Sequence, residues 1–335
     1  MGTKSIEINS GVESYEINFR KKIENILDTN KDLGLRGYVN FIHSSSLSTR
    51  LEYLKYIVGF LRYINKRKED LSLDDYTEYI CKIEDKTSSY QISVYSAMKK
   101  LSAYLAATGA SKFDYMQLIP RPKYIESQKT KEKRESAYLT EDELHKYMLN
   151  LNNGVGSSIA KAKQEQWRSR DQLMIQIFLT TGMRCSALYR LDVDSLDLEK
   201  GVLATVDKGR QVQLHHLSES VIETARKWLI EREEKGVSIN EKALFVSNRL
   251  NRMHVNSIAK VVNKYADSIK KTNFSPHKLR ATYGTHLYNE TKDVYLVQQC
   301  MGHSNPKTSE LYIRGQKDAS REKAASIMDG LIKQQ

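Results

Sequence analysis

The sequence predicts a mainly α-helical protein with a small β-hairpin, built as an N-terminal helical bundle followed by a mixed α+β domain. Apolar residues recur at helical spacing through the first third of the chain, and a polar stretch that begins at Pro120 interrupts that pattern. Strand-like alternation is clearest between Gly201 and Leu217. With 335 residues the chain is long enough for two domains, each with its own core.

We expect the helical bundle to span residues 32–118. The pattern that starts at Leu47 predicts one amphipathic helix, whose apolar face carries Leu51, Leu54, Val58 and Leu61. Ser72, with Asp75 three residues later, is typical of a helix start. A third helix has an apolar face formed by Ile92, Tyr95, Met98, Leu101 and Leu105, and Gly109 is placed to terminate it.

Two segments flank this bundle. Residues 1–31 form an N-terminal extension, which is either an additional protein or DNA contact or a segment without order. Residues 119–137 form a linker, because Pro120 and Pro122 cannot continue a helix and the lysine-rich stretch that follows offers almost no apolar anchor. The linker is either a solvated connector or a basic strap along DNA, with candidate DNA contacts at Arg121, Lys123, Lys129, Lys131, Lys133 and Arg134.

The second domain is predicted over residues 138–318 and starts with a capping box formed by Thr140 and Glu143. The segment Asp171–Thr181 is apolar enough to be a buried central helix. Alternation across Gly201–Leu217 predicts a hairpin that turns at Lys208-Gly209, and Leu244–Val246 reads as a further short strand.

The rest of the chain reads as helical. Asn305 precedes Pro306, a combination that favours a helix start. An amphipathic helix is expected in the tail, within residues 319–335. Three earlier helices are predicted over Val255–Ile269, Pro276–Tyr288 and Val294–Met301.

Composition restricts the class of partner. The net charge of +12 and the pI of about 9.3 favour an anionic polymer, through counterion release and electrostatic steering. The three cysteines lack metal-ligand spacing, which fits a reduced intracellular protein without a metal cofactor. Residues 1–10 do not resemble a secretory signal, and no apolar run is long enough to span a bilayer. We therefore expect a cytoplasmic, nucleoid-associated protein.

Several residues are suited to phosphate chemistry, although each taken alone has an ordinary structural explanation. His277 and Arg280 lie three residues apart on one predicted helix face, where arginine can grip a phosphate and histidine can move a proton. Arg184 follows the glycine that ends the central helix, and Lys208 lies on the hairpin turn. Tyr312 stands nine residues after His303; its phenol, with an ordinary pKa near 10, needs a base or nearby positive charge to become a nucleophile.

Taken together and in this order, these motifs resemble the tyrosine recombinase (phage integrase) family. Thr181-Gly182-Met183-Arg184 is similar to the first arginine box of that family, and Lys208 to its hairpin lysine. The second box is matched by His277-Lys278-Leu279-Arg280, by Met301-Gly302-His303-Ser304 and by Leu311-Tyr312-Ile313-Arg314. The implied fold is a helical core-binding, SAM-like bundle joined to a tyrosine-recombinase catalytic domain.

The resemblance implies a cofactor-free site-specific DNA recombinase that works through a 3′-phosphotyrosine intermediate. Tyr312 is then the nucleophile, and the other implied catalytic residues are Arg184, Lys208, His277, Arg280 and His303. The implied partners are double-stranded recombination sites and a homotetramer that exchanges the C-terminal helix, with accessory DNA-bending proteins. Since the N-terminal extension exceeds the minimal two-domain layout, integration or excision of a mobile element is favoured over chromosome dimer resolution.

One position departs from the family pattern. The family usually carries an acidic residue three positions after the first arginine, where this chain has Ala187; Asp192 and Asp194 are candidates to replace that carboxylate.

Two alternative functions remain open. One is a type IB topoisomerase, which has a similar arginine, lysine and tyrosine set, and the other is a catalytically silent DNA-binding protein of the same fold.

Overall fold

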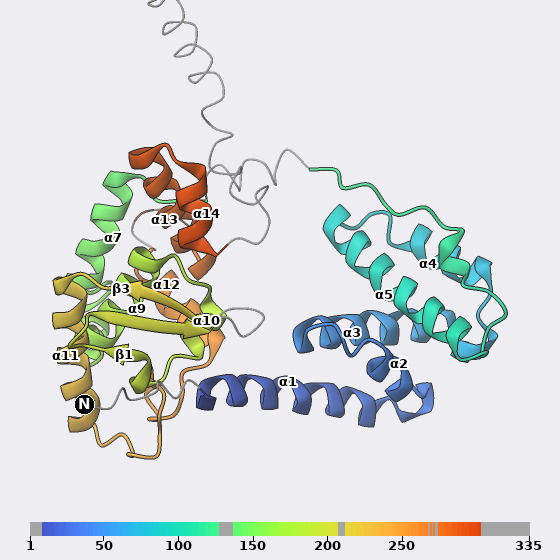
Figure 1. The fold of residues 1–335 in the computed structure, drawn as a ribbon, viewed down its shortest axis with the longest axis horizontal. Helices are drawn as coiled ribbons and strands as arrows, with labels where there is room; N and C mark the ends of the chain where they lie inside the picture. Colours follow the sequence, from blue (N-terminus) through green and yellow to red (C-terminus); the bar gives the residue numbers. More distant parts are fainter. Residues whose placement is uncertain are drawn as a thin grey trace, which may run out of the picture. The chain divides into compact units, whose positions relative to one another are not determined.

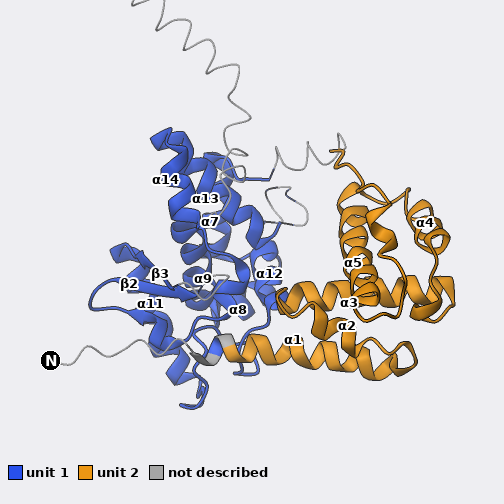
Figure 2. Ribbon diagram, turned by 45° about the vertical axis from the view of Figure 1, so that its right-hand side comes forward, with its two compact units in different colours: residues 1–12, 132–335 blue, residues 13–131 orange. Residues whose placement is uncertain are grey.

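A computed structural model describes residues 9–126, 137–206, 212–266, 269, 271 and 274–302 (Figure 1). The chain divides into two compact units, a helical unit and a mixed unit (Figure 2). Residues 13–131 form the helical unit, and residues 1–12 together with 132–335 form the mixed unit. The domain boundaries expected from the sequence remain predictions.

The helical unit contains most of α1 (Asn9–Thr29) and four further helices, with short 3-10 turns between some of them. The helices are α2 (Arg36–Phe41), α3 (Leu47–Ile64), α4 (Leu73–Lys82) and α5 (Ser88–Ala107). The 3-10 turns cover Lys31–Leu33, Lys68–Asp70 and Tyr115–Gln117. Helix α3 packs against α5, and the apolar faces expected from the sequence meet there: Leu54 and Leu101 are fully buried. Ile23 and Leu27 of α1 belong to the same core, so the N-terminal extension contributes to it.

Helix ends in this unit follow local sequence chemistry. The hydroxyl of Ser72 accepts from the backbone N–H of Asp75, and the Asp75 carboxylate accepts from the backbone N–H of Ser72, which confirms the predicted helix start. Helix α5 ends at Ala107, and Gly109 follows with a φ of 72°, a value that glycine adopts readily.

The mixed unit holds the remaining elements that the structure describes. Its helices are α7 (Glu141–Asn153), α8 (Ser158–Glu165), α9 (Arg168–Thr181), α10 (Cys185–Tyr189), α11 (Glu219–Glu234), α12 (Val255–Lys264), α13 (Pro276–Thr291) and α14 (Val294–Met301). A 3-10 turn at Val193–Ser195 precedes a sheet of β1 (Leu196–Asp197), β2 (Val202–Val206) and β3 (Val212–His216). Helix α9 is central: it packs against α7, α11 and α13 (Figure 1), and its Leu173 and Phe178 are fully buried.

The sheet is antiparallel, in the order β1-β2-β3. Thr205 pairs with Gln213 and Leu203 with His215, so these four residues share one face of the hairpin. The predicted hairpin is therefore confirmed, while its turn, including Lys208, lies outside the described residues. The predicted strand at Leu244–Val246 is wrong: the structure has two isolated bridges here, Asp192 with Ala243 just before the segment and Val246 with Arg252 at its end, and no continuous ladder between them.

The three helices predicted between residues 255 and 301 are present, and two of them end at other residues than predicted. Helix α14 has the predicted bounds, α13 continues three residues beyond Tyr288 to Thr291, and α12 stops at Lys264, five residues before Ile269. The helices expected near Asn305 and in the tail lie outside the described residues. The mainly α fold with one small sheet is confirmed. Within the described ranges, no helix has both the length and the hydropathy needed to cross a membrane.

Candidate active site

The first arginine is delivered by the turn after α9. Gly182 caps this helix with a φ of 61°, and its N–H donates to the carbonyl of Phe178. A Cβ at this position would stand 2.3 Å from Cδ1 of Tyr283, so both the backbone conformation and the space require glycine. The chain then turns directly into α10, and Arg184 is the residue at its N-cap. The Thr181-Gly182 step thus fixes where Arg184 enters the site.

The second arginine is held by the ends of two other helices. Arg280, on α13, is 5% exposed and donates to the carbonyl of Gly182 at 2.5 Å and to that of Met301 at 2.6 Å. These carbonyls stand at the C-terminal ends of α9 and α14, where the helix leaves acceptors unsatisfied and the helix dipole is negative. The guanidinium therefore joins three segments that are far apart in sequence.

His277 shares the first turns of α13 with Arg280, and Pro276 occupies the first helical position. His277 lies at an exposed position, yet the surrounding protein partly desolvates its ring. This desolvation, followed by the charges of Arg280 and Arg184, lowers the pKa of His277. Arg184 and Arg280 line one cavity, and His277 lies on α13 one turn before Arg280, so the three predicted residues belong to the same region of the mixed unit.

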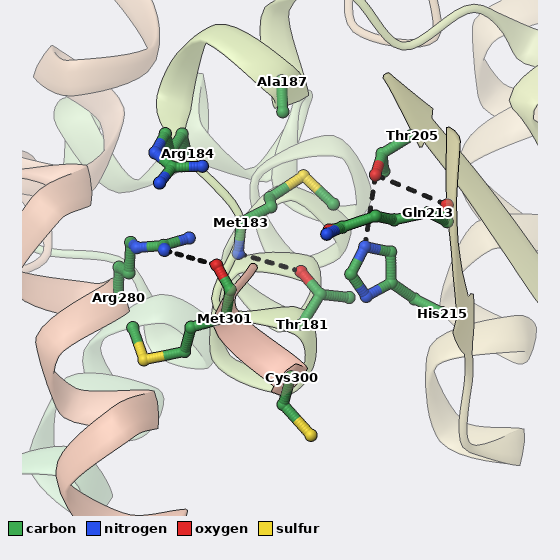
Figure 3. A pocket seen from close by; sticks show the side chains of 10 residues that line it. All are labelled: Thr181, Met183, Arg184, Ala187, Thr205, Gln213, His215, Arg280, Cys300 and Met301. Atoms are coloured by element: carbon green, nitrogen blue, oxygen red, sulfur yellow. Dashed lines mark hydrogen bonds between the residues drawn. The ribbon is translucent and has the colours of Figure 1, made fainter. Parts of the chain in front are cut away.

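A small cavity connects the arginines with the sheet (Figure 3). The side chains of Thr205, Gln213 and His215 approach it from β2 and β3, opposite Arg184 and Arg280. The full lining is Thr181, Met183, Arg184, Ala187, Thr205, Gln213, His215, Arg280, Cys300 and Met301. The cavity thus combines two cations with polar groups from the hairpin.

Three of the six predicted catalytic residues lie outside the described residues: Lys208, His303 and Tyr312. The structure describes the elements next to Lys208 and His303. Strands β2 and β3 flank residues 207–211, and α14 ends at Met301, two residues before His303. Among the predicted DNA contacts, Arg121 and Lys123 are exposed, while Lys129, Lys131, Lys133 and Arg134 lie outside the described part of the chain.

A tyrosine close to the arginines is a poor alternative nucleophile. Tyr283 packs its ring against Gly182 and lines a surface hollow with Cys300. Burial, followed by the neighbouring Cys300, raises the pKa of Tyr283 to about 12. The phenolate of Tyr283 is therefore harder to form than that of an ordinary tyrosine, and its ring is held by packing against Gly182.

The position of the missing acid is filled by a buried methyl group. Ala187 is 4% exposed and lies on the cavity wall (Figure 3). Of the two proposed replacements, Asp194 is exposed, and the buried Asp192 carboxylate accepts from Arg252. A carboxylate whose charge is already offset by Arg252 is a weak candidate for holding Arg184 as well.

Sequence reasoning missed the polar wall of the cavity. The sequence pattern places Thr205, Gln213 and His215 in the hairpin and gives them no further role, although strand alternation puts them on one face. The sequence does show three polar residues on one face of the predicted hairpin, which is unusual for a face that packs against another element. Alternation alone could not show which helix would lie against that face.

Comparison with known proteins now places the chain. The phage integrase family profile matches residues 137–318, more than half of the chain. Tyrosine recombinase XerC of Thermodesulfovibrio yellowstonii is 30% identical over 148 residues, which cover 43% of this chain and 49% of that protein. XerC of Caldanaerobacter subterraneus subsp. tengcongensis is 27% identical over 301 residues, covering 82% of this chain and 80% of the relative. The chain thus aligns with about half the length of some of these relatives.

Solved structures share the fold at lower identity. The XerH site-specific recombinase, crystallised with a palindromic difH substrate after cleavage, has a TM-score of 0.66 at 22% identity, with 85% of this chain and 81% of XerH covered. The Tn1549 transposon integrase, in complex with transposon right end DNA, has a TM-score of 0.58 at 17% identity, covering 87% and 98% respectively. The resemblance read from the sequence motifs is confirmed, and this protein belongs to the phage integrase family.

Proposed function

We propose that this protein is a site-specific DNA recombinase that cuts and rejoins DNA strands through a 3′-phosphotyrosine intermediate. The observation that carries the proposal is that Arg184 and Arg280, from two separate segments of a phage integrase domain, line one cavity, with His277 one turn before Arg280 on α13. Electrostatic stabilisation of a phosphorane-like transition state requires positive donors that are already in place before the reaction. The hydrogen bonds that fix Arg280 to two helix ends provide this preorganisation.

Each residue has a defined role in the proposed reaction. Arg184 and Arg280 bind the non-bridging oxygens of the scissile phosphate, and His303 shares this task. His277 orients the phosphate or handles the proton of the tyrosine; the lowered pKa of its ring favours the neutral form, which can accept a proton. The roles of Lys208, His303 and Tyr312 come from the family motifs that they match.

The proposed reaction exchanges one phosphate ester bond for another. The Tyr312 oxygen attacks the phosphorus and the bond from phosphorus to the 5′-oxygen breaks, while Lys208 protonates the departing alkoxide. The phosphotyrosine ester retains the phosphodiester energy, so the 5′-hydroxyl of a second strand can attack it and release the tyrosine. The product is a rejoined strand, formed without a nucleotide triphosphate.

The decisive experiment is a covalent trap. The full-length protein is incubated with a library of nicked duplexes with randomised sequence around the nick, from which the cleaved fragment diffuses away, and denaturant-resistant protein–DNA adducts are collected. We expect an adduct with the wild type and none with Tyr312→Phe. The control is Tyr295→Phe, which changes a tyrosine that is 77% exposed and should leave the yield unchanged.

The outcomes separate the alternatives. Adduct formation by Tyr312→Phe would show that another tyrosine is the nucleophile. A wild type that binds DNA without any adduct would support the catalytically silent protein, the alternative that Ala187 favours. Captured sequences are then tested in a two-site assay: exchange between two duplexes supports recombination, and relaxation of supercoils without exchange supports the topoisomerase.

Finer aspects of the function belong to the same proposal. We propose a cytoplasmic homotetramer on paired duplex sites that exchanges the helix within residues 319–335, and a role in moving a mobile element, with accessory DNA-bending proteins as further partners. The preference for a mobile element comes from the sequence, in which residues 1–31 exceed the minimal two-domain layout. Sedimentation of the protein on a captured duplex pair, with and without residues 319–335, tests the tetramer and the exchange.

A further inference from the structure

The start of α7 is tied to α13, the helix that carries Arg280. Leu139 is fully buried and immediately precedes Thr140, the N-cap residue of α7. The backbone N–H of Leu139 donates to the hydroxyl of Thr282 at 2.9 Å, and its carbonyl oxygen lies 2.9 Å from Nε2 of His286. Thr282 and His286 are one turn apart on α13, so they lie on one face of that helix. Both main-chain groups of one residue are therefore bound by the same helix.

The chemistry of these groups fixes the direction of each hydrogen bond. A carbonyl oxygen can only accept, so Nε2 of His286 carries the proton in its bond to Leu139. Thr282 accepts from the Leu139 N–H and donates its own proton to the carbonyl of Lys278 at 2.9 Å. Lys278 precedes Arg280 by two residues, so this chain of hydrogen bonds reaches the turn of α13 that holds the arginine.

Two bonds from one residue restrict a movement that apolar packing leaves open. Helix α13 packs against α9, and packed helices can slide past one another by small amounts. Leu139 holds α13 at two points one turn apart, so a shift along the helix axis disturbs the geometry of both bonds. This restriction matters for Arg280, because its guanidinium must reach the carbonyls of Gly182 and Met301 at the same time.

We propose that Thr282 and His286 are positioning residues of the candidate active site, which bind the main chain of Leu139 and so fix the axial position of α13 and of Arg280. The inference rests on the recombinase function proposed above. Neither residue is among those that line the cavity, so their effect on the reaction passes through α13. A displacement of about 1 Å at a reacting group can cost about 10²-fold in rate, so a small movement of the helix is sufficient.

The chain supplies matched controls. Thr291 donates to the carbonyl of Leu287 at 2.7 Å, the same bond to the preceding turn that Thr282 makes, but it is exposed at the C-terminal end of α13. Thr291→Val therefore removes an equivalent hydroxyl from the same helix without touching Leu139. For the histidine, His145→Leu changes an exposed position of α7. Differences between the paired variants report on the bonds to Leu139.

The first test is kinetic and uses the full chain with a captured nicked duplex, well below the melting temperature of every variant. For Thr282→Val and for His286→Leu we expect the rate of adduct formation at saturating DNA to fall about tenfold to a hundredfold, while DNA affinity stays near the wild-type value. Thr282→Ser keeps a hydroxyl and His286→Gln keeps an N–H donor, so both should retain most of the rate. Thr291→Val and His145→Leu should match the wild type.

A double-mutant cycle separates positioning from a general loss of structure. If Thr282 acts through Arg280, Thr282→Val should slow an Arg280→Lys protein by about threefold or less, because the guanidinium that it positions is already gone. If Thr282 contributes only to the fold, its loss should multiply with that of Arg280→Lys.

Three kinetic results would overturn the proposal. Wild-type rates for Thr282→Val and His286→Leu would show that the bonds to Leu139 are not needed. Equal losses for His286→Leu and His286→Gln would show that ring shape, rather than a donor, matters. Independent, multiplying losses in the cycle with Arg280→Lys would assign Thr282 to the fold.

The second test does not depend on catalysis. Spectra of ¹⁵N-leucine-labelled protein, with the signal assigned by Leu139→Met, report hydrogen exchange at the Leu139 amide. We expect slow exchange in the wild type and in Thr282→Ser, and exchange at least about tenfold faster in Thr282→Val. Fast exchange in the wild type would refute the inference even if the covalent adduct forms. Slow exchange in a wild type that forms no adduct would instead refute the recombinase function, and the positioning role with it, while the hydrogen bonds stand.

Discussion

Two clusters of buried or half-buried arginine in the mixed unit differ in how their charge is balanced. In the first, Arg170 is 4% exposed and pairs at 2.8 Å with Asp171, which is fully buried. Lys264 and Tyr265 reach the other oxygen of the same carboxylate. In the second, Arg184 and Arg280 face a cavity, and desolvation followed by their charges lowers the pKa of His277. The first cluster is built around a buried carboxylate, whereas in the second Arg280 donates to main-chain carbonyls at two helix ends.

The difference teaches what each cluster does. A buried ion pair that satisfies its own hydrogen bonds is suited to holding segments together, since neither charge is available to a ligand. A guanidinium that is anchored by main-chain carbonyls keeps its full charge while losing its mobility, as Arg280 does at Gly182 and Met301. Such an arrangement suits a group that must stabilise the charge of a bound phosphate.

The largest expected effect tests the second cluster. Arg280→Lys keeps the charge but cannot donate to both helix ends in the same geometry. We expect the rate of adduct formation at saturating DNA to fall about 10²- to 10³-fold, comparable to losing one preorganised donor in other enzymes. Arg249→Lys, at an exposed position, is the control. A rate for Arg280→Lys within a few-fold of the wild type would remove Arg280 from the site.

The second prediction tests the first cluster. Asp171→Asn leaves Arg170 and Lys264 without their buried carboxylate, and we expect the free energy of unfolding to fall by about 3–5 kcal/mol. The rate of adduct formation per folded molecule should not change, because this cluster is assigned to stability. Urea unfolding measures the first quantity, with the exposed Asp142→Asn as the control. A stable but inactive Asp171→Asn protein would contradict the division of roles.

The third prediction concerns the turn that joins the second cluster to α9. Gly182 and Gly236 both have positive φ, 61° and 74°, but only Gly182 has a neighbour where a Cβ would lie. Gly236→Ala therefore measures the conformational cost alone, about 1–2 kcal/mol. Gly182→Ala should be destabilised further and should also slow adduct formation, because the Tyr283 ring and Arg184 must shift. Equal unfolding free energies for the two variants would show that the Tyr283 ring can move aside without a loss of stability.

The smallest effect is the pH dependence of stability from His277. Its pKa in the folded protein lies below the ordinary 6.5, so the unfolded chain binds the proton more readily. His277 therefore does not reduce the free energy of unfolding above about pH 6.5. Below that pH it lowers the free energy of unfolding increasingly, down to the folded pKa. His277→Gln removes the imidazole, so the free energy of unfolding measured with urea should change less with pH between about pH 5 and pH 8. If the free energy of unfolding fell more steeply with decreasing pH in the variant than in the wild type, the predicted direction would be wrong.

Local sequence patterns predicted many elements correctly. The capping box at Thr140 and Glu143 forms with both hydrogen bonds, and α14 has its predicted bounds. These features depend on residues only a few positions apart, so they can be read without knowing the fold. Helices α1 and α11 were not predicted; Trp228 of α11, for example, is fully buried, and its indole N–H donates to the carbonyl of Leu244, 16 residues further along the chain.

The strand predicted at Leu244–Val246 fails for a related reason. A short apolar run reads the same whether it forms a strand or a buried loop. In the structure the carbonyl of Leu244 accepts from the Trp228 indole and that of Val246 accepts from Arg170. Side chains thus take acceptors that a neighbouring strand would otherwise need.

The sequence by itself determined the family, through the spacing of Arg184, His277 and Arg280 with the motifs around Lys208, His303 and Tyr312. It also determined the mainly helical fold and the hairpin, because hydrophobic periodicity and caps act over one or two turns. Only the tertiary structure decided how Arg280 is held and which polar groups face Ala187. Those contacts join helix ends and a strand face far apart in the chain, and no local pattern encodes which of them will meet.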